Sequence, residues 1–192
     1  MYHQIYKRIA IILFYSWLLS ASGCMIVNAD AEFSSTVQQE SSDPSKAIPV
    51  TDDSFVCLQK MHPVRGFFVG NLIDKLDDTV AAATREGGAV YPPGSIVQLI
   101  PTEVMIKHNK GWSAVTNDWE FFELSVSEEG SKIKVRGTTQ VKNKFGGNCF
   151  GCHLKAKPQW DFICEKDHGC DSLPIPDFLI RGSQHGDPRC QE

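Results

Sequence analysis

The stretch Trp119-Glu120-Phe121-Phe122-Glu123-Leu124-Ser125-Val126 carries the clearest fold signal in the chain. Apolar and polar side chains alternate along it, with the period of a half-buried strand. The side chains expected to face inward are Phe122, Leu124 and Val126, with Glu123 and Ser125 on the opposite face. A turn, Ser127-Glu128-Glu129-Gly130, leads into a second alternating run from Lys132 to Arg136, with Ile133 and Val135 inward. Two such runs joined by a short turn predict an antiparallel hairpin.

Shorter β-rich runs precede this hairpin. Ile96 to Ile100 and Val104 to Lys107 are separated by Pro101 and follow the turn Tyr91-Pro92-Pro93-Gly94. Further upstream, between Phe67 and Glu86, Leu72, Leu76 and Val80 recur at helical spacing, and we expect an amphipathic helix that ends at Gly87-Gly88. The fold class predicted is therefore mainly β with a few helices (α+β), built on an antiparallel sheet.

Downstream of the hairpin stands the single C-x-x-C-H motif of the chain, Cys149-Phe150-Gly151-Cys152-His153, after a strand expected to end near Val141. This is the signature of c-type haem attachment. Two thiols add to the haem vinyl groups, and the adjoining histidine ligates the iron. The sequence thus predicts one covalent haem c on Cys149 and Cys152, with His153 as the iron ligand. The alternatives are a redox-active C-x-x-C pair, half of a zinc site, and chance.

The N-terminus has the organisation of a secretory signal, which suits haem attachment outside the cytoplasm. Lys7 and Arg8 precede an apolar run from Ile9 to Leu19, shorter than the roughly 20 residues of a membrane span. We expect a signal peptide over residues 1–23 and a lipidated Cys24 after Ala21-Ser22-Gly23, with cleavage at Ala29-Asp30-Ala31 as the alternative. Residues 24–54 are expected to form a flexible linker, and 55–192 one haem domain. The predicted location is periplasmic or extracytoplasmic, with a lipid anchor to the membrane.

The cysteine count agrees with export. Of seven cysteines, setting aside Cys24 and the two in the motif leaves four. An even number in an oxidising compartment predicts two disulfides. We favour Cys164 with Cys170, which closes a short loop, and Cys57 with Cys190, which ties the two ends of the domain together. A zinc site formed by Cys164, His168 and Cys170 is the alternative, although it lacks an evident fourth ligand. The net charge of −4 argues against a nucleic-acid partner.

The second axial position of the iron is less clearly specified. No methionine follows the motif, so a conventional electron carrier with histidine and methionine ligands is poorly supported. A five-coordinate iron could bind a small molecule. The residues that could reach the iron from elsewhere in the fold are His62, His108, Met61 and Met105.

The order of motifs resembles the cytochrome P-460 family. The matching segments are Tyr91-Pro92-Pro93-Gly94, Glu103-Val104-Met105-Ile106-Lys107, Asn117-Asp118-Trp119-Glu120-Phe121-Phe122 and Gly146-Gly147-Asn148-Cys149-Phe150-Gly151-Cys152-His153. The resemblance implies an antiparallel β fold with one haem c, ligated by His153. Some members oxidise hydroxylamine with a lysine joined to the haem, and the related cytochromes c′-beta bind nitric oxide without that link. By position, Lys107 matches the cross-linking lysine best, and Lys110 second.

The four additional cysteines depart from the simple family pattern and put the catalytic activity in question. We expect an oxidoreductase that acts on hydroxylamine or a nitrogen oxide, with Glu103, His108 or Glu120 as proton acceptor. A nitric oxide or other diatomic gas binder, its pocket lined by Phe121 or Met105, and an electron-transfer protein are the alternatives. The expected partners are a small nitrogen-containing ligand or diatomic gas and a redox protein, and we allow for a homodimer.

Overall fold

The computed structural model describes residues 42–190. The predicted signal peptide, Cys24 and residues 24–41 of the predicted linker lie outside the described residues. Residues 42–54, the rest of that linker, pack against the domain instead. Ile48 is buried, and its N–H donates to His108 Nδ1 at 2.8 Å. The packed part of the chain therefore begins before residue 55, because this segment supplies apolar side chains to the core.

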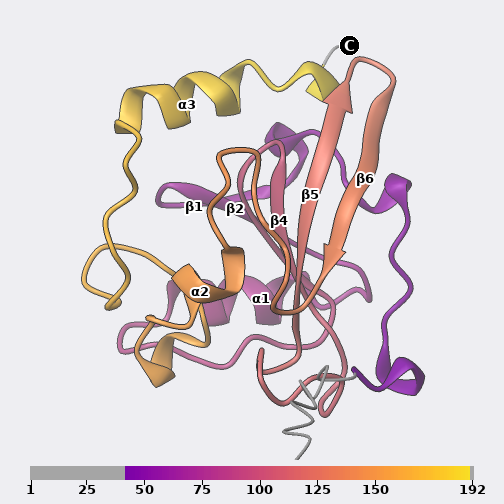
Figure 1. Ribbon diagram of the computed structural model, residues 1–192, viewed down its shortest axis with the longest axis vertical. Helices are drawn as coiled ribbons and strands as arrows, with labels where there is room; N and C mark the ends of the chain where they lie inside the picture. The colour runs from indigo at the N-terminus through magenta and orange to yellow at the C-terminus, as the bar shows by residue number, and fades with distance from the viewer. Residues whose placement is uncertain (1–41, 191–192) are drawn as a thin grey trace, which may run out of the picture. The chain divides into compact units, whose positions relative to one another are not determined.

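Six strands form one antiparallel sheet, in which each strand is hydrogen-bonded to the next in the sequence (Figure 1). The strands are β1 (His62–Val64), β2 (Phe67–Asn71), β3 (Ser95–Ile100), β4 (Glu103–Lys107), β5 (Trp119–Ser127) and β6 (Gly130–Gly137). The described residues also contain three α-helices, α1 (Leu76–Thr84), α2 (Cys149–His153) and α3 (Asp177–His185). The predicted mainly β, α+β class and the predicted hairpin are confirmed.

The helix predicted between Phe67 and Glu86 is partly wrong. Its first quarter is strand β2, and α1 begins only at Leu76. Asn71 explains the break, because its Oδ1 accepts the N–H groups of Ile73 and Lys75 and ends the strand in a turn. The buried face also differs from the predicted one. Leu76 is 42% exposed, whereas Thr79 and Ala83 are buried.

Strands β4 and β5 are buried on both faces. One face carries a core cluster that includes Met105, Phe121 and Trp119, against which Cys149 and Phe150 of α2 pack. We call this the α2 face. The opposite face carries a second cluster of Phe55, Ile96, Val104, Ile106, Phe122 and Leu124. The sequence predicted only one buried face for β5. Trp119 and Phe121 on the other face are also apolar, but they share that face with the polar Glu123 and Ser125, which made it look exposed.

A bulge changes the inward residues of β6. Leu124 pairs with Ile133, but the next pair is Glu123 with Val135, so Lys134 is an extra residue. Such an insertion turns the following side chain to the other face. Ile133 packs against the second cluster, as predicted, whereas Val135 is 43% exposed. The predicted inward position of Val135 is therefore wrong.

The segment between β6 and α2 is a loop rather than the predicted strand. β6 ends at Gly137, and a single bridge joins Lys142 to Asn148. Val141 is fully buried, and its carbonyl accepts the Cys149 N–H at 3.0 Å. The loop is thus held down at both ends, which fixes where α2 starts.

Two disulfides close the domain in the pairing that the sequence favoured. Cys57 is bonded to Cys190, with a Cα–Cα distance of 4.9 Å, and Cys164 to Cys170, with 5.6 Å. The alternative zinc site is not formed, because both of its sulfurs are in a disulfide. Within residues 42–190, no group of three or more His, Cys, Asp or Glu side chains could hold a metal ion.

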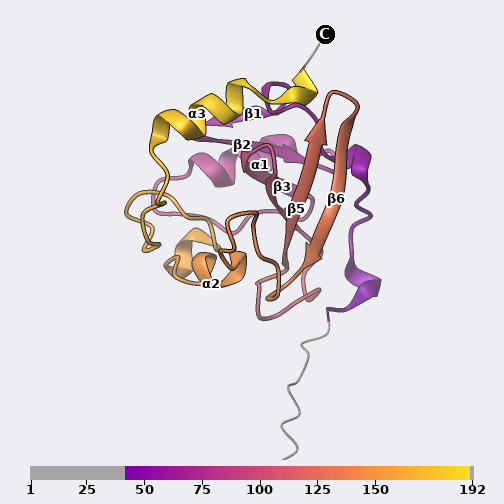
Figure 2. The ribbon, with the colours of Figure 1, turned by 45° about the horizontal axis from the view of Figure 1, so that its top comes forward.

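Gln184 bonds helix α3 to the sheet and to the turn before β2. Gln184 Nε2 donates to the carbonyls of Gly66 and Leu99, each at 2.8 Å. Figures 1 and 2 show α2 and α3 on the same side of β5, connected by the segment that follows α2. No helix in the described part of the chain is long and apolar enough to span a membrane.

Candidate functional site

Helix α2 is a short helix whose start is fixed by Asn148. The Asn148 Oδ1 accepts the Gly151 N–H at 2.6 Å, and its Nδ2 donates to the Thr139 carbonyl at 2.8 Å. An N-cap of this kind satisfies helix-start N–H groups that have no partner in the helix. Cys149 and Cys152 are three residues apart in the helix, so their thiols lie on the same side of it.

His153 is held in one tautomer. Its Nδ1 is 2.6 Å from the carbonyl oxygen of Phe162, which can only accept a hydrogen bond, so Nδ1 carries the proton. The Nε2 lone pair is then available for a metal. Burial lowers the pKa of His153, against a smaller opposite effect of the Phe162 carbonyl. The side chain is therefore a neutral imidazole, with the Phe121 ring 5.4 Å from its own.

Cys149 and Cys152 are the free cysteines of the described residues. Burial, followed by the charges of Glu103 and Glu123, raises the pKa of Cys149 to about 11. The pKa of Cys152 is also raised, by burial and then by Asp171. Redox-active C-x-x-C cysteines have lowered pKa values, since the thiolate is the reactive form. The surroundings of this pair therefore do not suit thiol–disulfide chemistry.

Two carboxyl groups lie beside the Cys149 thiol. Glu103 and Glu123 are directly opposite each other on β4 and β5, on the α2 face. One oxygen of each is buried without a hydrogen-bond partner. Burial and then the Glu123 charge raise the pKa of Glu103, and burial raises that of Glu123. Glu103 was a predicted proton acceptor, but Glu123 was missed, because only the strand register brings it to the site.

The other two predicted proton acceptors lie on the opposite face of the sheet. His108 Nε2 donates to Glu120 Oε2 at 2.8 Å, and Arg136 donates to both Glu120 oxygens at 2.7 Å. Burial acts to raise the pKa of Glu120, but the hydrogen bonds from His108 and Arg136 more than offset it and leave the pKa lowered. Both residues are satisfied in a buried network that also holds Ile48, away from Cys149.

Lys107 lies on the α2 face, and its ammonium is fully engaged. Its Nζ is 2.8 and 2.9 Å from the two oxygens of Asp161 and 2.6 Å from the Asn117 carbonyl, with the Trp119 ring centroid at 4.9 Å. Burial lowers the pKa of Lys107, and Asp161 opposes this effect. Asp161 was not among the predicted site residues, and it gives Lys107 an ion-pair role. Lys110 is exposed beyond the end of β4.

The four predicted second ligands are spread over the fold. His108 and Met61 belong to the side of the second cluster, and His62 is exposed on β1. Met105 is buried on the α2 face, opposite Phe121 in the strand register. Met105 is thus the candidate that shares a core cluster with Cys149.

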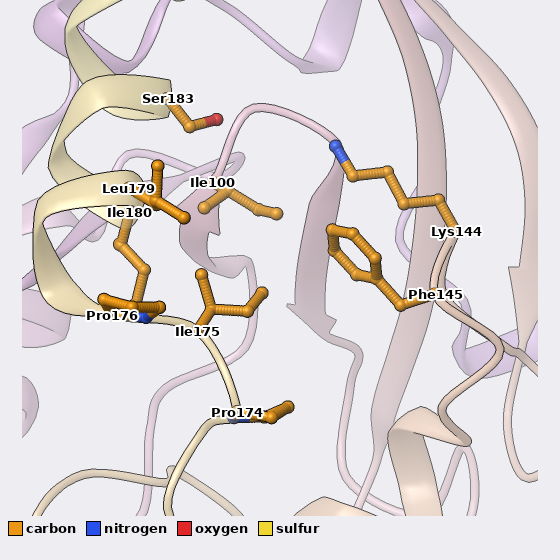
Figure 3. Close-up of a pocket in the computed structure, with 9 residues that line it drawn as sticks. All are labelled: Ile100, Lys144, Phe145, Pro174, Ile175, Pro176, Leu179, Ile180 and Ser183. Carbon is orange, nitrogen blue, oxygen red and sulfur yellow. The ribbon is translucent and has the colours of Figure 1, made fainter.

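A pocket of about 270 Å³ lies between α3, the end of β3 and the loop that precedes α2 (Figure 3). Its lining is mostly apolar and consists of Ile100, Lys144, Phe145, Pro174, Ile175, Pro176, Leu179, Ile180 and Ser183. Phe145 faces it from one side, with Ile100, Ile175 and Leu179 on the other. We call it the α3 pocket.

No protein-family model, no curated protein and no solved structure matches this chain.

Proposed function

We propose that the protein is an exported monohaem c-type cytochrome, with haem joined to Cys149 and Cys152 and the iron ligated by His153 Nε2. The observation that carries the proposal is the bond from His153 Nδ1 to the Phe162 carbonyl, which leaves Nε2 free beside two unpaired thiols. The four other cysteines of the described residues are all in disulfides, so these two thiols are set apart for another use. Haem attachment is the use that explains the adjoining histidine.

We infer further that the bound haem acts in oxidation or reduction of hydroxylamine or a nitrogen oxide. Haem would supply a redox-active iron able to bind such a nitrogen ligand. Glu103 and Glu123 support this reading, because a carboxyl group with a raised pKa exchanges protons closer to neutral pH than an ordinary one. Oxidation of hydroxylamine releases protons, and in this proposal Glu103 would accept one. The electrons would pass to a redox partner protein.

Nitric oxide binding without turnover is the second candidate. The buried, apolar Met105 and Phe121 on the α2 face favour it, since an apolar setting suits an uncharged diatomic ligand. The lysine cross-link to haem through Lys107 stays a prediction from the family resemblance, beside the ion pair that Lys107 makes with Asp161.

Haem attachment is tested by expressing the full chain with the c-type haem maturation machinery. The intact mass should exceed that of the processed chain by one haem, and Cys149→Ala should abolish normal attachment. His153→Ala should keep the covalent haem and change its spin state in the optical spectrum. His185→Ala, on the exposed end of α3, is the matched control and should leave the spectrum unchanged. Absence of covalent haem from the wild-type protein would overturn the proposal.

The reaction is tested by turnover of hydroxylamine with an artificial electron acceptor. Glu103→Gln should reduce the rate about a hundredfold, the effect of losing a general base, while the exposed Glu86→Gln should not. A spectrum that responds to nitric oxide without hydroxylamine turnover would establish the gas-binding alternative. A low-spin spectrum that responds to neither ligand would rule out both.

A further inference from the structure

Ile175, just before α3, and Leu179 and Ile180 within it form one wall of the α3 pocket. Leu179 lines the α3 pocket and is 52% exposed, although it faces the domain (Figure 3). Ile180 and Ile175 line the same pocket and are half-buried. Apolar side chains that face inward and stay accessible are typical of a ligand site.

The position of this wall is fixed independently of its own packing. Gln184, one helical turn after Ile180, binds the Leu99 carbonyl, and Leu99 packs into the core cluster that Cys149 and Phe150 join. After α3, Cys190 is the last described residue, and its disulfide to Cys57 ties this end of the chain to the domain. The wall is therefore held at a set distance from the sheet.

The pocket and the thiol site share neighbours. Ile100, which lines the pocket, pairs with Glu103 across β3 and β4. Glu103 lies close enough to interact electrostatically with the Cys149 thiol and with the ammonium of Lys144, another lining residue. Phe145 of the lining lies four residues before Cys149, in the loop that leads into α2. The pocket therefore lies next to the loop that leads into α2, and it shares the neighbouring residue Glu103 with the Cys149 thiol.

We propose that the α3 pocket receives an edge of the haem held by Cys149 and Cys152, and that Ile175, Leu179 and Ile180 form the wall against it. The inference rests on the proposed haem attachment. Haem would fit this site because much of its ring is apolar, as most of the lining is, and because Lys144 and Phe145 of the lining stand in the loop that leads to Cys149. Lys144 is the one cationic residue of the lining and could pair with a haem carboxylate that came within its reach.

The test places a charge on the wall and measures the midpoint potential of the haem. Leu179→Asp should favour the oxidised iron and Leu179→Lys the reduced iron. Each should shift the oxidised-to-reduced ratio at a fixed potential by about tenfold, or 59 mV for one electron. Phe178→Asp and Phe178→Lys are matched controls, because Phe178 neighbours Leu179, is 65% exposed and does not line the pocket. A folding defect would not shift the midpoint potential in opposite directions for the Asp and the Lys variants.

The outcomes separate this inference from the haem proposal. Opposite shifts at position 179, larger than those at 178, support the inference. If covalent haem is present but both positions respond equally, the pocket does not receive haem and the haem proposal stands. A wild-type chain without covalent haem overturns both.

Discussion

At the scale of single residues, the α2 face buries more charge than an ordinary sheet face. Lys107 and Asp161 form an ion pair with almost no exposed side-chain surface, and Glu103 and Glu123 share one cross-strand position. Buried charges are stable only where hydrogen bonds or opposite charges compensate them. The Lys107–Asp161 pair is fully compensated, whereas the Glu103–Glu123 pair is compensated only in part. The two pairs should therefore respond differently to substitution.

Lys107→Met should destabilise the protein by about 3 to 5 kcal/mol, because it leaves the Asp161 carboxylate buried without its cation. Adding Asp161→Asn should recover part of the loss, since the amide needs no counter-charge. The free energy of unfolding in urea measures both. A loss below about 1 kcal/mol in the single variant would show that the ion pair is not what holds Asp161.

The Glu103 and Glu123 pair should make stability depend on pH. Their pKa values are raised, so the folded state binds their protons more tightly than the unfolded state does. This contribution is complete below the usual glutamate pKa of about 4.3 and is lost as the pH rises through the raised values. Relative to the Glu103→Gln/Glu123→Gln double variant, the wild-type protein should lose stability as the pH rises over that range.

A series of urea unfolding curves from about pH 4 to 8 measures this difference. The exposed Glu86→Gln variant serves as the control and should follow the wild-type profile. Parallel profiles for the wild type and the double variant would contradict the assigned direction of the two pKa values.

At the scale of elements, the bulge in β6 decides which residues support the hairpin. Ile133 packs into the second cluster, whereas Val135 lies past the bulge and is exposed. Ile133→Ala should therefore reduce the free energy of unfolding by about 1 to 2 kcal/mol, since the side chain is half-buried. Val135→Ala should stay within about 0.5 kcal/mol. Equal losses of unfolding free energy in the two variants would mean that Ile133 and Val135 lie on the same face of the sheet.

Local periodicity explains which elements could be predicted. The hairpin alternates over enough residues to be recognised, β3 and β4 are β-rich runs separated by Pro101, and α2 coincides with the C-x-x-C-H motif. Strands β1 and β2 were missed because they are short, and because Leu72 and Leu76 continue a helical spacing across the break that Asn71 makes. The bulge at Lys134 leaves no mark in the apolar pattern.

At the scale of the whole molecule, the two disulfides constrain the chain very differently. Cys57 and Cys190 are 133 residues apart, but Cys164 and Cys170 only 6. Because a cross-link removes more freedom from the unfolded chain when its loop is longer, Cys57→Ser/Cys190→Ser should cost about 4 to 5 kcal/mol and Cys164→Ser/Cys170→Ser about 2 kcal/mol. Urea unfolding of both double variants gives the order, and the reverse order would contradict it.

Contacts between distant parts of the chain set the limit of sequence reasoning for the site. Cys149, Cys152 and His153 could be predicted because they are adjacent in the sequence. The partners Lys107 and Asp161 are 54 residues apart, and nothing in either local sequence points to the other. Likewise, Glu120 and Glu123 look alike in the sequence, yet one faces His108 and the other faces α2, since they lie on opposite faces of β5.

The setting of Cys149 also bears on how the chain matures. Among the described residues, four cysteines form cross-links while Cys149 and Cys152 remain thiols. Exchange with a disulfide requires the thiolate, and a pKa of about 11 leaves roughly one Cys149 in ten thousand ionised at neutral pH. Once the domain has folded, the Cys149 thiol therefore exchanges with disulfides only slowly, and its burial helps to keep it apart from the four cross-linked cysteines of the described residues.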